Sequence, residues 1–203
     1  MNLNGRNLTE ERYLELDKYK VYIGIPHNQP KQYKSFRDRI DVMKGFIGGE
    51  WVSYLSGIQI NQKNSWVIEW RNDCEIETMR NAIVLNALEN KYDFILQIDS
   101  DMDMFPIDLP YYMMDKMLKD DIDILSSVAY TRNGVKHDSD PLNYFGPVVF
   151  KLNSKEPYDL KLFNGIVEDD LMTGCACMMV KSSVFRKPNT LNLNQKKSVE
   201  YPY

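Results

Sequence analysis

The fold of this chain is decided by one stretch, Phe94-Ile95-Leu96-Gln97-Ile98-Asp99-Ser100-Asp101-Met102-Asp103. Its first five residues are mostly apolar, which is typical of a strand buried on both faces of a parallel sheet. Three carboxylates follow at alternate positions, and an extended chain places alternate side chains on one side. Such close anions repel one another unless a cation offsets their charge. The stretch therefore predicts a buried strand that ends in an acidic site.

Strands and helices alternate around this stretch. The residue pattern predicts strands at 21–25, 65–70, 122–130 and 173–180, and helices at 9–20, 35–46, 73–89, 108–119 and 182–186. Asn72 and Glu75 fit a capping box at the start of the third helix. Strand–helix–strand units give parallel strands with right-handed crossovers. We therefore expect an α/β chain with a mostly parallel central sheet flanked by helices, in one Rossmann-like domain.

Sheets of this kind bind ligands beyond the carboxyl ends of their strands. Four segments fall just past the expected strand ends, and they are Pro26–Asn28, Arg71–Asp73, Asp99–Asp103 and Tyr130–Arg132. We expect the functional site to be built from these segments.

Composition narrows the class of protein. The chain has 203 residues, enough for one domain, with 29 acidic against 25 basic residues and a net charge of −4. Binding to a nucleic-acid backbone usually needs a basic surplus, so we expect no nucleic-acid partner. No apolar run approaches the roughly 20 residues of a membrane-spanning helix. No signal peptide is evident, and Cys74, Cys175 and Cys177 lack disulfide spacing, so we expect reduced thiols in a cytoplasmic protein.

The carboxylate and hydroxyl oxygens of the acidic stretch suit Mg²⁺ or Mn²⁺. A calcium-binding EF-hand loop starting at Asp99 is excluded, because Met104 stands where it needs Gly and Pro110 where it needs Glu. A haloacid-dehalogenase-type phosphatase also has Asp-x-Asp after a strand, but it carries Thr or Val at the place of Asp103 and normally uses the first strand. A nucleotidyltransferase would have a Gly-rich loop at 27–34, which contains no Gly.

Several motifs together resemble the GT-A fold glycosyltransferases of the family-2-like type. They are Arg80-Asn81, Ala87-Leu88, Asp93 to Met102, Phe105-Pro106, the opening strand that ends in Ile25-Pro26, and Gly174 to Lys181 with Val184-Phe185. The resemblance covers about residues 21–186. It implies a nucleotide-binding part at about 20–130, an acceptor-side part at about 131–186 and a weakly ordered tail at 187–203.

The resemblance also implies a reaction and its partners. The enzyme would move a sugar from a nucleotide-diphosphate donor to a hydroxyl of a carbohydrate or glycoprotein acceptor, with inversion at the sugar carbon. Mn²⁺ or Mg²⁺ would be held by Asp99, Asp101 and Asp103, and would offset the charge of the departing diphosphate. A non-catalytic nucleotide-sugar-binding module and another metal-dependent phosphate enzyme stay open as alternatives.

The remaining site residues follow from the same resemblance. Pro26, Asn28, Arg80 and Asp99 would border or contact the nucleotide, although Arg80 would equally serve a structural ion pair on its helix. The family's acidic motif after the Val-Phe helix does not occur before the end of this sequence. The nearest candidates for the catalytic base are Asp169 and Asp170, which would take the proton of the acceptor hydroxyl.

Overall fold

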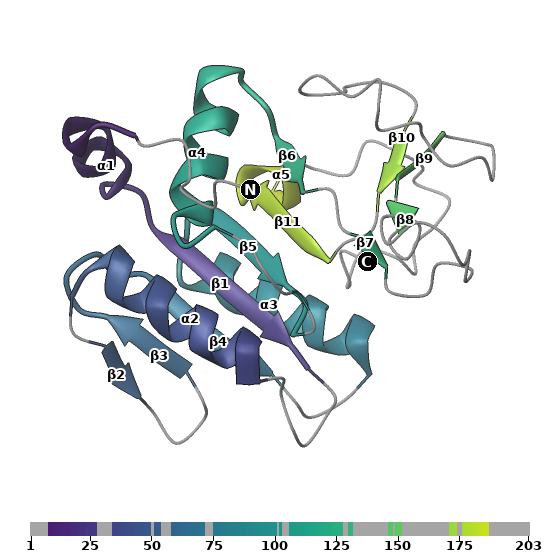
Figure 1. The fold of residues 1–203 in the computed structure, drawn as a ribbon, viewed down its shortest axis with the longest axis horizontal. Helices are drawn as coiled ribbons and strands as arrows, with labels where there is room; N and C mark the ends of the chain where they lie inside the picture. Colours follow the sequence, from purple (N-terminus) through teal and green to yellow (C-terminus); the bar gives the residue numbers. More distant parts are fainter. Residues whose placement is uncertain are drawn as a thin grey trace, which may run out of the picture.

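The computed structural model describes residues 8–27, 34–49, 51–53, 58–71, 75–100, 102, 106–127, 130–131, 146–147, 149–151, 171–173 and 176–186. Within these ranges, strands and helices form a layered α/β arrangement (Figure 1). The predicted α/β class is confirmed. No helix in the described ranges is long and apolar enough to cross a bilayer.

The main sheet has seven strands in the order β2-β3-β4-β1-β5-β11-β6. In that order they are β2 (Trp51–Ser53), β3 (Ile58–Asn61), β4 (Val67–Arg71), β1 (Val21–Pro26), β5 (Phe94–Ile98), β11 (Cys177–Lys181) and β6 (Ile124–Ser126). Two short two-stranded sheets pair β7 (Tyr130–Thr131) with β8 (Gly146–Pro147) and β9 (Val149–Lys151) with β10 (Leu171–Thr173). Both small sheets lie to the right of the main sheet in Figure 1.

The sheet is mixed, so the expectation of a mostly parallel sheet is corrected. Parallel pairing is found where β1 lies between β4 and β5. Strand β3 is antiparallel to both β2 and β4, and β11 is antiparallel to both β5 and β6. A short connection such as 62–66 joins only antiparallel neighbours, because a parallel neighbour needs a long crossover. Helix α3 supplies that crossover between β4 and β5.

Helices α1 (Glu10–Leu16), α2 (Lys34–Ile47) and α4 (Leu109–Lys119) cover one face of the sheet (Figure 1). The expected apolar stripe of α2 is confirmed, because Phe36, Ile40, Met43 and Ile47 are all buried in the core on this face. Helix α4 adds Met113, Met114 and Met117, and the neighbouring strands add Ile23, Ile68, Leu96 and Ile98.

Helix α3 (Ile76–Glu89) covers the other face, and α5 (Ser183–Arg186) brings Phe185 against the same core. Ile83 of α3 lies directly on Gly24 of β1. A Cβ added at Gly24 would be 2.3 Å from Ile83 Cγ2, so only glycine allows this approach. The contact fixes α3 against the centre of the parallel strands.

Some element boundaries differ from the sequence prediction. Helix α3 begins at Ile76 with Glu75 as its N-cap, and Glu75 makes no side-chain capping bond, so the predicted capping box is wrong. The predicted strand at 122–130 is two strands, β6 and β7, and the predicted strand at 173–180 becomes β10 and β11. Asp108 is the N-cap of α4, as predicted.

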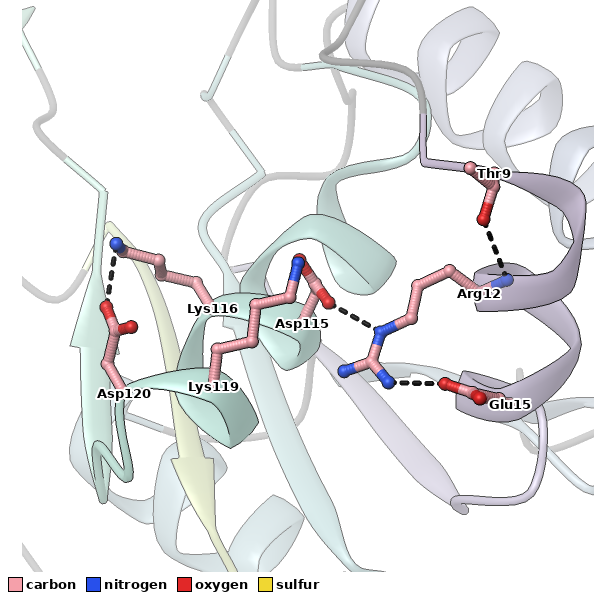
Figure 2. A network of polar contacts seen from close by, with 7 residues as sticks. All are labelled: Thr9, Arg12, Glu15, Asp115, Lys116, Lys119 and Asp120. Carbon is pink, nitrogen blue, oxygen red and sulfur yellow. Dashed lines mark hydrogen bonds and ion pairs between the residues drawn. The ribbon is translucent and has the colours of Figure 1, made fainter.

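A polar network joins α1 to α4 at the edge of the core (Figure 2). Arg12 Nε donates to Asp115 Oδ1 at 2.6 Å, and Lys119 Nζ donates to Asp115 Oδ2 at 2.8 Å. Arg12 also pairs with Glu15, while the hydroxyl of Thr9 caps α1 by accepting from the backbone N–H of Arg12. The Asp115 carboxylate therefore holds two cations from two helices.

Candidate functional site

The site lies at the carboxyl ends of β4, β1 and β5. The register places Pro26 of β1 opposite Arg71 of β4, and the backbone N–H of His27 donates to the Arg71 carbonyl at 2.9 Å. On the other side, the N–H of Asp99 donates to the carbonyl of Ala176 at 2.8 Å. This edge thus holds the ends of three parallel strands beside the beginning of antiparallel β11.

Asp99 is joined to helix α3 by an ion pair. Arg80 Nη2 donates to Asp99 Oδ1 at 2.7 Å, with 15% of the Arg80 side chain and 23% of the Asp99 side chain exposed. The Arg80 carbonyl also accepts from Nε2 of Gln97 at 3.4 Å. The chain turns directly after Asp99, because the N–H of Met102 donates to the Asp99 carbonyl at 3.0 Å. Asp99 is therefore fixed at both its backbone and its side chain.

The structure brings together three of the residues that the sequence singled out. Pro26 ends β1, Asp99 follows β5, and Arg80 reaches Asp99 from α3. Asn28, Asp101, Asp103, Asp169 and Asp170 lie outside the described residues. Among the described residues, no group of three or more His, Cys, Asp or Glu side chains is placed to hold a metal ion. The metal set predicted at Asp99, Asp101 and Asp103 stays a prediction.

Sequence reasoning missed a buried carboxylate, Glu69 of β4, which is 1% exposed. Glu69 Oε2 accepts from the Tyr22 hydroxyl at 2.7 Å, and Oε1 accepts from Arg71 Nη1 at 3.1 Å and from Asn86 Nδ2 at 3.4 Å. Burial, and then the neighbouring charge of Glu69, raise the pKa of Tyr22 well above its ordinary value. A Glu between the apolar residues Ile68 and Trp70 is the sequence signal that would have marked this position.

Sequence reasoning also missed Gln97, which is the polar residue of the otherwise apolar strand β5. It is 1% exposed and lies two residues before Asp99, so both side chains are on the α3 face of β5. Its Oε1 has no hydrogen-bond partner among the described residues. A buried acceptor without a partner is costly, and the amide nitrogen of the same side chain bonds the Arg80 carbonyl.

Cys177, at the start of β11, is a buried free thiol, as the sequence predicted. Burial, with a smaller effect from the nearby Asp99 carboxylate, raises the pKa of its thiol to about 11. The thiol is therefore protonated at neutral pH and is a poor nucleophile. Its role here is to pack against the core beside Ser127.

Comparison with known proteins gives one structural likeness. No protein-family model matches the chain, and no curated protein matches its sequence. Its fold is similar to the crystal structure of A197 from STIV, with a TM-score of 0.50 and 16% sequence identity, covering 85% of this chain and 70% of that one. At this identity the likeness concerns the fold alone.

Proposed function

We propose that this protein is a metal-dependent glycosyltransferase that moves a sugar from a nucleotide-diphosphate donor to an acceptor hydroxyl. The observation that carries the proposal is the ion pair of Asp99 with Arg80 at the carboxyl end of β5. The pair lies at the edge where α/β sheets bind ligands, immediately before Ser100-Asp101. The resemblance of the surrounding sequence to GT-A enzymes supports the same assignment.

In this proposal the Arg80–Asp99 pair holds the nucleotide. Asp99 is an acceptor for a ribose hydroxyl, and the ion pair with Arg80 orients its carboxylate. A charge-assisted hydrogen bond such as this one is shorter and stronger than a neutral one. Backbone groups of Pro26 and Asn28 would border the ribose and base. The site is then organised before the donor arrives, which reduces the cost of binding.

The carboxylates that follow β5 in the sequence would suit a divalent ion. Asp101 and Asp103, with Asp99, offer the hard carboxylate oxygens that Mn²⁺ or Mg²⁺ prefers. When bound, the ion would supply positive charge beside the diphosphate. Arg80 already offsets part of the negative charge of Asp99. We therefore assign the larger share of metal binding to Asp101.

The base would come from Asp169 or Asp170, which immediately precede β10 in the sequence. A carboxylate there would accept the proton of the acceptor hydroxyl as it attacks the sugar carbon, while the bond to the diphosphate breaks. Exchanging each for Asn separately would identify the base by a fall of about 10²-fold or more in transfer rate.

The test is release of nucleoside diphosphate from UDP- and GDP-sugars in the presence of Mn²⁺. We expect release by the wild-type chain, and a loss of at least about 10²-fold in Asp101→Asn. The matched control is Asp38→Asn, because Asp38 is an exposed aspartate of α2 outside the acidic stretch. Phosphate release from p-nitrophenyl phosphate without donor cleavage would instead indicate a phosphatase. Donor binding without turnover would indicate a binding module.

A further inference from the structure

Gln97 is a buried amide in the main sheet whose oxygen is unsatisfied. The side chain is 1% exposed, and its Oε1 has no hydrogen-bond partner in the part of the chain that the structure describes. Its neighbours in the strand register are Gly24, which has no side chain, and Met178, whose side chain has no N–H or O–H donor. An unsatisfied buried acceptor lowers stability, and in a native fold it points to a role other than packing.

The orientation of the Gln97 amide is set by helix α3. Nε2 of Gln97 donates to the backbone carbonyl of Arg80 at 3.4 Å. A flipped amide would place Oε1 against that carbonyl, so that two acceptors would face each other. Oε1 belongs to the same amide group and therefore lies within a few ångströms of the Arg80 backbone.

The Arg80 guanidinium lies on the same side of β5 as Gln97. Its Nη2 donates to Asp99 Oδ1 at 2.7 Å. The N–H of Asp99 donates to the carbonyl of Ala176, so the chain stays extended up to Asp99. The side chains of Gln97 and Asp99 therefore share one face, with their Cα atoms roughly 7 Å apart. A guanidinium carries five N–H donors in a planar fork and can bond two acceptors at once.

Ligand binding at the proposed site would change the balance at Arg80. A divalent ion near Asp99 repels the guanidinium, and a ribose hydroxyl that donates to Asp99 draws on the same carboxylate. Both effects weaken the attraction between Asp99 and Arg80. Gln97 precedes Asp99 in the chain, so its Oε1 lies on the side of Arg80 away from the carboxyl end of β5. An acceptor in that place can hold the guanidinium while a ligand engages Asp99.

We propose that Gln97 is a positioning residue for Arg80, and that its Oε1 becomes a second acceptor of the guanidinium when a ligand engages Asp99; this inference rests on the proposed function. The Arg80 fork then bridges Asp99 Oδ1 and Gln97 Oε1. The Gln97 oxygen is unsatisfied in the free protein and bonded in the loaded protein. Gln97 therefore lowers the stability of the free state and raises the affinity of the site.

The experiment compares the wild-type chain with Gln97→Met, which keeps the length of the side chain and removes both polar atoms. Calorimetric titration with Mn²⁺ and UDP or GDP measures affinity, and urea unfolding without ligand measures the stability of the free protein. We expect the affinity to fall about tenfold, the effect of one lost hydrogen bond to a charged group. The urea midpoint should stay at or above the wild-type value.

Gln59→Met is the matched control. Gln59 Oε1 is also buried without a hydrogen-bond partner among the described residues. Gln59 belongs to β3, and β4 and β1 separate that strand from β5. We expect its urea midpoint to stay at or above the wild-type value as well, while its affinity remains within about twofold of wild type because the two sites are far apart.

Arg80 provides two further readouts. In an Arg80→Ala background, Gln97→Met should change the affinity by less than about twofold, because its effect acts through the guanidinium. In nitrogen NMR spectra of the arginine side chains, the Nε–H signal of Arg80 is identified by its absence from Arg80→Ala. We expect this signal to shift when the wild-type chain is loaded, and to shift less in Gln97→Met.

The outcomes separate this inference from the proposed function. A folded wild-type chain that binds neither nucleotide with Mn²⁺ would contradict the proposed function and the inference with it. If the wild type binds, an unchanged affinity in Gln97→Met overturns the inference alone, as does a tenfold loss that persists in the Arg80→Ala background. A Gln97→Met chain that is less stable than wild type or does not fold would show a structural role and overturn it. An Arg80 signal that does not move on loading would overturn it too.

Discussion

Arg80 and Asp99 form the contact that joins helix α3 to the end of β5, with Nη2 and Oδ1 2.7 Å apart. The two residues are 19 positions apart in the sequence and are brought together by the crossover from β4 to β5. Arg80 belongs to helix α3, which covers one face of the sheet, and Asp99 is the first residue of the acidic stretch. The pair therefore links the fold to the proposed site.

Arg80→Ala should weaken both stability and nucleotide binding. Removing the guanidinium leaves a largely buried carboxylate without its cation, and a hydrogen bond to a charged group contributes about 1.5–3 kcal/mol. We expect the free energy of unfolding to fall by about that amount in urea titration. A double-mutant cycle with Asp99→Asn should give a coupling energy of about 0.5–3 kcal/mol. Strictly additive effects would mean that the two side chains do not support each other.

Gly24→Ala should be strongly destabilising, because the new Cβ would lie 2.3 Å from Ile83 Cγ2. Overpacking of this kind costs about 1–3 kcal/mol or more. Gly24→Ala should cost less in an Ile83→Ala background, because that substitution removes the Cγ2, Cγ1 and Cδ1 atoms that the new Cβ would meet, and thermal unfolding of the single and double variants measures the difference.

Gly45→Ala is the matched control for that substitution. Gly45 lies in helix α2, and no atom beyond its own helix backbone and chain neighbours lies within 4 Å of the place an added methyl would take. We expect a gain of about 0.5–1 kcal/mol, because alanine is the better helix former. A Gly24→Ala protein as stable as the wild type would contradict the close packing of α3 on β1.

Asp115→Asn should reveal a pH-dependent contribution to stability. Burial alone would raise the pKa of Asp115, but hydrogen bonds from Lys119 and Arg12 outweigh it and hold the pKa below its ordinary value. A carboxyl with a lower pKa in the folded state stabilises the protein above its unfolded pKa, near about 4. That contribution is lost as the pH falls through the folded pKa.

We therefore expect Asp115→Asn to cost about 1–3 kcal/mol at pH 7, with the difference from wild type shrinking as the pH falls below about 4. Urea unfolding at a series of pH values measures it. The control is Glu15→Gln, which removes the other partner of Arg12. Because the Glu15 side chain is 48% exposed, its loss should cost less than about 1 kcal/mol. If the difference in unfolding free energy between wild type and Asp115→Asn does not change with pH, the lowered pKa of Asp115 is contradicted.

Local patterns were enough to predict much of the fold. The apolar run at 94–98 and the stripe of α2 are buried as their periodicity indicates. The direction of β11 was not predictable, because it depends on the path of the chain before residue 177. The capping pattern at Asn72 and Glu75 was also misleading, since the helix begins only at Ile76.

The candidate site was predictable where one segment carries the signal. Asp99 and Arg80 were found from their motifs, and the structure brings them into contact. Glu69 was missed because its burial depends on Tyr22, 47 residues away in the sequence, and on Asn86 of the covering helix. A contact between distant segments leaves no local pattern beyond one polar residue in an apolar strand.

The most direct test of the central claim is calorimetric titration of the wild-type chain with UDP and GDP, with and without Mn²⁺. The account predicts that at least one of them binds only, or at least about tenfold more tightly, with the metal present, and that Asp101→Asn loses this dependence while Asp38→Asn keeps it. Absence of binding by either nucleotide in the presence of Mn²⁺, in a chain shown to be folded, would contradict the account.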